Sequence, residues 1–228
     1  MAGRDRSVAS RKGGTSMATD LKKSKRRAFR PTTEPELTWE IARLFPAQGE
    51  WSEEEYFALD NNHRVEYSDG FLEFLPMPTI FHQLMLQFIF KTLEAFVEAH
   101  DLGIVVISGY KVRLRARKYR EPDILFIKTA HRSGIKEQYC EKADFVIEVV
   151  SDQNRPHDIK TKRVEYAKAG IPEYWIIDPE RREITVLVLK SRQRAYTEFG
   201  VFRKGTTAAS KLLPGFTVDV TTALSQKP

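Results

Sequence analysis

The chain has 228 residues, of which 41% are apolar or aromatic, so it is long enough for one domain with a proper core and short for two. Its formal net charge is +6, but residues 1–30 carry ten Lys or Arg and two Asp, which leaves residues 31–228 with a net charge of −2. The basic charge therefore belongs to the N-terminal segment, and overall charge gives no argument that the folded body binds nucleic acid.

A single cysteine, Cys140, excludes an intramolecular disulfide and a cysteine-rich zinc site, and it is compatible with a reducing compartment. No apolar stretch approaches the length needed to span a bilayer, because the longest one, residues 84–97, is interrupted by Gln, Lys and Glu. We therefore expect a cytoplasmic protein without a membrane partner.

Residues 1–33 are rich in Arg, Lys, Ser and Gly and nearly lack large apolar side chains, which predicts a disordered basic arm. The run Lys-Lys-Ser-Lys-Arg-Arg at 22–27 could contact phosphates. The alternatives are a solvated arm, or residues upstream of a later start at Met17. We place one folded domain behind the arm, over residues 34–225.

The elements expected in this domain begin with Ser52-Glu-Glu-Glu55, which has the form of a capping box and predicts a short helix. An Asp69-Gly70 turn between apolar runs predicts a hairpin, and apolar residues at helical spacing predict a helix over 82–100. A second helix is expected over 155–169, closed by Gly170. Further strands are expected at 104–108, 110–115, 124–127, 145–150, 173–177, 183–189, 196–202 and 216–218. This order predicts an α/β fold with a mixed β-sheet flanked by helices.

Two acidic residues occur where strands should be buried. Asp123 stands at the mouth of an apolar strand, in Arg-Glu-Pro-Asp-Ile-Leu-Phe-Ile, and Glu148 lies inside the β-branched run Phe-Val-Ile-Glu-Val-Val. A carboxylate is costly to bury unless a cation or a donor meets it. Mg²⁺ is held by one or two carboxylates together with water, so the pair predicts a site for Mg²⁺ (or Mn²⁺).

A lysine is expected beside these acids. At about 100° per residue, the face of the second helix that packs on the sheet carries Ile159, Lys162, Tyr166 and Ala169, whereas Lys160 and Lys168 point towards solvent. The alternative is an ordinary ion pair within the helix between Lys162 and Asp158, with Glu148 paired to a buried arginine.

Several runs occur in an order that resembles a known family. They are Arg-Val-Glu-Tyr-Ser-Asp-Gly-Phe-Leu-Glu (64–73), His82, Glu-Pro-Asp-Ile-Leu-Phe-Ile (121–127), Phe-Val-Ile-Glu-Val-Val-Ser (145–151) and the block from Asp-Ile-Lys to Trp-Ile-Ile-Asp (158–178). Over about residues 52–216 the chain resembles the Uma family of restriction endonuclease-like proteins, within the PD-(D/E)XK nuclease superfamily. The resemblance implies a restriction-endonuclease-like core and Mg²⁺-dependent hydrolysis of DNA.

The same resemblance assigns roles to individual residues. Asp123 matches the motif aspartate and Glu148 the second acid, so both are implied metal ligands. The usual lysine lies two residues after the second acid, where this chain has Val150, and Lys162 on the following helix matches the migrated lysine of Uma-like members. Glu66 matches an acidic position that could add a ligand.

Two further positions are accessory. His82 matches a recurrent histidine, with a surface histidine at a helix N-terminus as the alternative; Asp158 is the neighbour of Lys162. After Glu148 the chain departs from the family, because Ser151-Asp152-Gln153-Asn154 replaces a Ser-Pro-Ser-like turn. Asp152 could assist or perturb metal binding there.

One strand has a basic face, made by Lys111, Arg113 and Arg115, and the charge continues through Arg117, Lys118 and Arg120. Phosphate contacts supply most non-specific affinity for nucleic acid, so this strand is the best candidate for DNA contact. The alternative is a sheet face made soluble by charge.

The sequence thus predicts an endodeoxyribonuclease in which Asp123 and Glu148 bind metal, Lys162 orients or activates the attacking water, and Glu66 assists. A non-catalytic nucleic-acid or protein-binding module with the nuclease fold is the alternative, and RNA is a weaker alternative substrate. A homodimer is compatible with cleavage of both strands of a duplex, although no interface is indicated.

Overall fold

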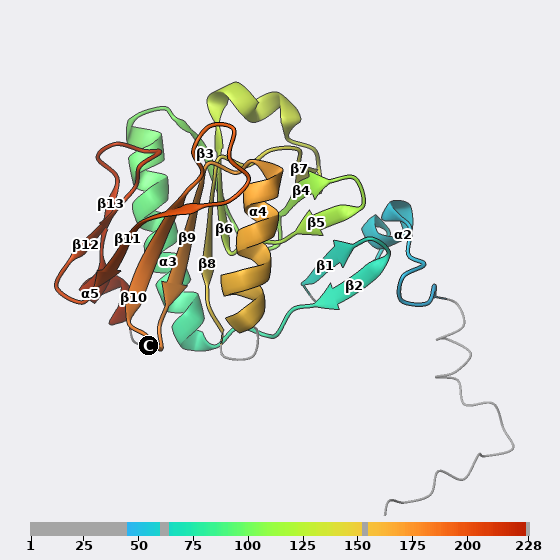
Figure 1. Cartoon of the computed structure of the whole chain (residues 1–228), viewed down its shortest axis with the longest axis horizontal. Helices are drawn as coiled ribbons and strands as arrows, with labels where there is room; N and C mark the ends of the chain where they lie inside the picture. Colours follow the sequence, from blue (N-terminus) through green and yellow to red (C-terminus); the bar gives the residue numbers. More distant parts are fainter. Residues whose placement is uncertain (1–44, 60–63, 152–154, 227–228) are drawn as a thin grey trace, which may run out of the picture. The chain divides into compact units, whose positions relative to one another are not determined.

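The computed structural model describes residues 45–59, 64–151 and 155–226 (Figure 1). The basic arm predicted over 1–33, the predicted domain start at residue 34 and the residue Asp152 lie outside these ranges, so the predictions made for them stay predictions. Within the described ranges, no helix is both long enough and apolar enough to cross a membrane.

A six-stranded sheet carries the acidic residues, and its strand order is β11-β10-β9-β8-β6-β3. Only β8 and β9 pair in parallel, so the sheet is mixed, as predicted. A parallel pair needs a crossover connection, and here a helical segment supplies it. The strands are β3 (Gly103–Ile107), β6 (Ile124–Lys128), β8 (Phe145–Val149), β9 (Glu173–Asp178), β10 (Glu183–Val188) and β11 (Thr197–Arg203).

Helices cover both faces of this sheet (Figure 1). Alternate side chains of a strand point to opposite faces. Ile124 and Phe126 accordingly join the core under α3 (Ile80–Ala99), whereas Leu125 and Ile127 join the core under α4 (Arg163–Ala169). The short helix α5 (Val220–Leu224) packs on the α3 side, next to the two-stranded sheet of β12 (Thr207–Ala209) and β13 (Thr217–Asp219).

A second sheet, in the order β2-β1-β5-β4-β7, holds the predicted hairpin. Asp69 and Gly70 both have positive φ, as a two-residue hairpin turn requires. The capping box before α2 (Glu53–Phe57) is confirmed, because Ser52 Oγ accepts from the Glu55 amide at 3.1 Å and Glu55 Oε2 accepts from the Ser52 amide at 2.8 Å. The strands are β1 (Val65–Ser68), β2 (Phe71–Phe74), β4 (Lys111–Arg115), β5 (Lys118–Arg120) and β7 (Tyr139–Cys140).

The crossover between β8 and β9 differs from the regular helix predicted over 155–169. Residues His157–Lys162 form a π-helical segment, η2, and a regular α-helix, α4, continues to Ala169. π-Helical turns are rare in proteins, and those that do occur are often at functional sites. Gly170 closes the helix with φ of 80°, as predicted. A 3₁₀ segment, η1 (Thr129–Gly134), occupies the loop after β6.

Candidate metal and catalytic site

The two predicted acids lie on neighbouring segments of the sheet, Asp123 directly before β6 and Glu148 on β8. Ile124 of β6 pairs with Ile147 of β8 in antiparallel register, so one further step along the register sets Asp123 opposite Glu148. Because side chains alternate along each strand, both acids lie on the face that α4 covers. Each is only 3% exposed, so the surrounding donors decide whether its charge can persist.

Asp123 is held by three donors from three separate parts of the chain. The Val149 amide donates to Oδ2 at 2.8 Å, Arg64 Nη1 donates to Oδ1 at 3.1 Å, and His82 Nε2 lies 3.2 Å from Oδ2. Burial disfavours the charged carboxylate, but the hydrogen bond and charge of His82 and the charge of Arg64 outweigh it and lower the pKa of Asp123 to about 2. This residue is therefore ionised at neutral pH.

Lys162 points inward, as its position on the helix predicts. Its Nζ donates to Glu148 Oε1 at 2.9 Å, and lies 3.2 Å from Asp158 Oδ1 and 3.5 Å from Glu66 Oε1. The ion pair within the helix is thus present, but Lys162 bridges it to Glu148. Among the described residues, no arginine hydrogen-bonds to Glu148.

The predicted orientation of the remaining helical side chains is mostly confirmed. Tyr166 is buried and Lys160 and Lys168 are exposed, but Ala169, predicted to face the sheet, is exposed because the helix ends at Gly170. The Tyr166 hydroxyl donates to Glu148 Oε1 at 2.6 Å, so this oxygen accepts from two side chains of the crossover.

Negative charge exceeds positive charge around Lys162. Burial, together with the charges of Asp123 and Asp158, raises the pKa of Glu148 to about 8, although Lys162 acts in the opposite direction. Burial also disfavours the Lys162 ammonium, but the surrounding carboxylates raise its pKa above the ordinary value. Without a further cation, Glu148 therefore holds a proton near neutral pH.

A pocket of about 250 Å³ opens onto these groups. Its polar wall contains five of the predicted residues, namely His82, Asp123, Glu148, Asp158 and Lys162, together with Arg64. Its other wall is apolar and comes from the segment between β2 and α3 and from the start of α3. Glu66 does not line the pocket; it is fully buried behind Lys162.

The donor set fits a hard divalent cation. Glu148 Oε2 accepts no hydrogen bond from the residues that the structure describes. Asp123, which lies opposite Glu148 in the strand pairing, is ionised. Two carboxylates at a pocket that also admits water and a phosphate oxygen match the usual Mg²⁺ environment. Mn²⁺ accepts the same oxygen ligands.

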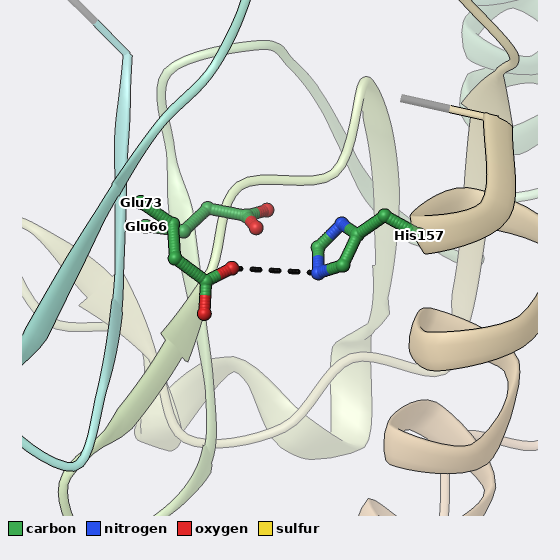
Figure 2. A group of neighbouring side chains, drawn as sticks. All are labelled: Glu66, Glu73 and His157. Carbon is green, nitrogen blue, oxygen red and sulfur yellow. Dashed lines mark ion pairs between the residues drawn. The ribbon is translucent and has the colours of Figure 1, made fainter. Parts of the chain in front are cut away.

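A second acidic group is formed by Glu66, Glu73 and His157 (Figure 2). Their ligand atoms lie within 4.8 Å of one another, and Figure 2 shows the His157 ring directed at the Glu73 carboxylate, 3.4 Å away. Arg120, however, donates to Glu66 Oε2 at 2.9 Å and to Glu73 Oε2 at 2.6 Å. A guanidinium group thus already balances these carboxylates, which makes the group an ion-pair network.

Arg120 corrects the prediction of a continuous basic surface. It is only 1% exposed and also binds Glu165, because β5 carries its side chain between the hairpin and α4. On the neighbouring strand β4, Lys111 pairs with Glu121 at 3.3 Å and Arg115 with Asp69 at 2.7 Å. The DNA contact proposed for Lys111, Arg113 and Arg115 stays a prediction.

Replacing Arg120 by leucine is expected to lower the free energy of unfolding by about 3–5 kcal/mol, because it leaves Glu66 buried without its partner. Arg115→Leu is the matched control. It breaks an ion pair in which both side chains are about half exposed, so its cost should stay below about 1 kcal/mol. Urea unfolding of both variants measures the difference. An equal decrease in the free energy of unfolding would show that the buried network stabilises the fold no more than the exposed ion pair does.

Three contributors to the site were not predicted. Arg64 begins the hairpin run, Tyr166 was assigned only to a packing face, and Arg120 was counted as surface charge. Each would have needed knowledge of a partner more than fifteen residues away in sequence. The signal that existed for Arg120 was its position directly before Glu121-Pro122-Asp123.

Comparison with known proteins agrees with this geometry. A family model described as "Uma2: Putative restriction endonuclease" matches residues 53–221, a range that includes every residue of the pocket's polar wall. A search of curated proteins found no match. A solved structure titled as a putative nuclease belonging to DUF820, from Anabaena variabilis, is similar in fold: 15% sequence identity, a TM-score of 0.63, and coverage of 79% of this chain and 98% of that chain. The match over most of the chain shows that this protein belongs to the Uma2 family of restriction endonuclease-like proteins.

Proposed function

We propose that the protein is a divalent-metal-dependent endonuclease that hydrolyses phosphodiester bonds in DNA. The observation that carries the proposal is the convergence of Lys162 Nζ and Glu148 Oε1, 2.9 Å apart, in a pocket that also contains Asp123. Membership of a family described as restriction endonuclease supports the reaction class. The near-neutral folded body supports a substrate bound at a local site instead of along a broad basic surface.

Asp123 and Glu148 would hold Mg²⁺ or Mn²⁺. Such an ion supplies polarisation of the phosphate and a lowered pKa of bound water when it is present. Arg64 and His82 keep Asp123 ionised and fix its orientation, and Tyr166 fixes Glu148.

Lys162 acts on the water and on the phosphate. Its ammonium group lines the pocket, so it can orient the attacking water and stabilise negative charge that develops on the phosphate oxygens. Asp158 and Glu66 hold that ammonium in place and keep it protonated. We assign Glu66 this supporting position, since both of its oxygens already accept, from the Glu121 amide and from Arg120.

The proposal is tested with purified protein on supercoiled plasmid, single-stranded DNA and RNA. Cleavage of DNA is expected with Mg²⁺ or Mn²⁺, and EDTA should abolish it because no side chain of the pocket replaces the ion's role. Undiminished cleavage in EDTA, or no cleavage of any substrate with either ion, would contradict the proposal.

Metal affinity is expected to increase with pH. Glu148, with a pKa of about 8, must lose its proton before it can bind the ion. Each unit of pH below about 8 should therefore weaken Mn²⁺ binding by up to about tenfold, and affinity should level off above that value. Calorimetric titration across this range, in two buffers that differ in ionisation enthalpy, measures both the affinity and the released proton. An affinity that does not change with pH would show that Glu148 is not a ligand.

A further inference from the structure

The segment between β2 and α3, together with the first turn of α3, presents large apolar side chains to solvent. Met77 is 76% exposed, Ile80 55% and Phe81 53%. Exposed apolar groups gathered beside a polar site are typical of a surface that contacts a ligand. Figure 1 shows this segment running from the hairpin to the first turn of α3.

Two of these side chains, Met77 and Phe81, belong to the pocket that holds the acids. Met77 and Phe81 line its apolar wall, together with Leu75, Pro76, Pro78 and Met85. Phe81 directly precedes His82, whose Nε2 lies 3.2 Å from Asp123 Oδ2. A ligand with a phosphate at Asp123 and Glu148 would therefore meet the Phe81 ring within the same cavity.

The backbone at Phe81 is ordered before any ligand arrives. Thr79 caps the helix by accepting from the His82 amide at 3.2 Å, so Phe81 lies in the first turn of a 20-residue helix. Pro76 and Pro78 restrict the backbone that leads to it. An aromatic ring carried by an ordered helical turn can act as a platform without the entropy cost of ordering a loop.

The charges of the pocket favour an unpaired strand. Among the residues that the structure describes, the lysine and arginine of its lining, Lys162 and Arg64, are both paired with carboxylates, so this lining offers no free Lys or Arg to the phosphates of a duplex. The apolar wall instead matches the face of a nucleobase, which is available only when the base is not stacked in a duplex. Stacking on an aromatic side chain is a large part of the affinity of proteins for single strands.

We propose that the substrate is single-stranded DNA, and that the base next to the scissile phosphate stacks on Phe81. This inference rests on the proposed function. Met77 flanks the same base. The protein would then cleave unpaired regions in preference to intact duplex.

Binding of a fluorescent single-stranded DNA, followed by anisotropy in Ca²⁺, tests this without requiring cleavage. Phe81→Ala is expected to weaken binding about tenfold, and Phe81→Trp to retain it. Phe199→Ala is the matched control, because Phe199 is 47% exposed on β11 and does not line the pocket. The corresponding duplex should bind more weakly than the single strand, with no effect of Phe81→Ala.

The outcomes separate this inference from the proposed function. Equal binding of single strand by wild type and Phe81→Ala overturns the stacking role, even if DNA is cleaved. Tighter binding of an RNA of the same sequence would overturn the assignment to DNA. If Phe81→Ala converts a dimer to a monomer in size-exclusion chromatography and leaves DNA affinity unchanged, the apolar wall is a self-association surface and the inference is wrong.

Discussion

Replacing Lys162 by methionine is expected to lower the rate of Mn²⁺-dependent DNA cleavage by about 10³-fold while Mn²⁺ still binds. Methionine keeps much of the length of the side chain but removes the ammonium that lies 2.9 Å from Glu148 Oε1. Both carboxylates proposed to hold the ion remain, so the loss should fall on the chemical step. Single-turnover cleavage with saturating Mn²⁺ measures it directly.

Lys160→Met is the matched control, because Lys160 is on the same helical segment and is exposed. It should cleave at the wild-type rate. Thermal unfolding in the presence of Mn²⁺ must show that the Lys162 variant is folded, since three carboxylates lose their partner. Near wild-type cleavage by folded Lys162→Met would remove Lys162 from the proposed mechanism.

Replacing Asp123 by asparagine is expected to abolish cleavage at every accessible Mn²⁺ concentration. The change removes a carboxylate that is ionised at neutral pH and lines the pocket. The asparagine side-chain amide that replaces it is neutral and would face the three donors that contact Asp123. Plasmid nicking and oligonucleotide cleavage measure the loss.

The chain offers a close control in Asp144→Asn. Asp144 is a buried aspartate of the same sheet region, and it accepts from a backbone amide, that of Lys128, at 2.9 Å and contacts His131 at 2.7 Å. It precedes β8, whereas Glu148 and Asp123 lie at the other end of the β6–β8 pairing. Equal loss of activity in both variants would indicate a general effect on folding instead of a metal ligand.

Local patterns were enough to predict the direction of the main side chains. The period of a helix distinguishes the inward Lys162 from the outward Lys160 and Lys168 without knowledge of the fold. The cost of burying a carboxylate likewise marked Asp123 and Glu148. The turn at Asp69-Gly70 and the capping box at Ser52 were predictable because both are set by residues adjacent in sequence.

Long-range pairing was not predictable in the same way. Arg120 in isolation looks like part of an exposed basic strand, and only the meeting of β1, β2 and α4 supplies Glu66, Glu73 and Glu165 around it. The π-helical segment η2 was missed because its residues have ordinary helical preferences. This segment contains Lys162 and Asp158, which pair with each other, and Lys162 also pairs with Glu148.

Titration of the protein with Mn²⁺, followed by calorimetry on three forms, tests the central claim most directly. Two clusters of acidic side chains among the described residues compete for the assignment, the Asp123–Glu148 pair at the pocket and the Glu66–Glu73–His157 group beside Arg120. We predict that wild type and Glu73→Gln each bind one ion, and that Asp123→Asn binds none. Loss of binding in Glu73→Gln with retention in Asp123→Asn, or no binding by wild type, would contradict it.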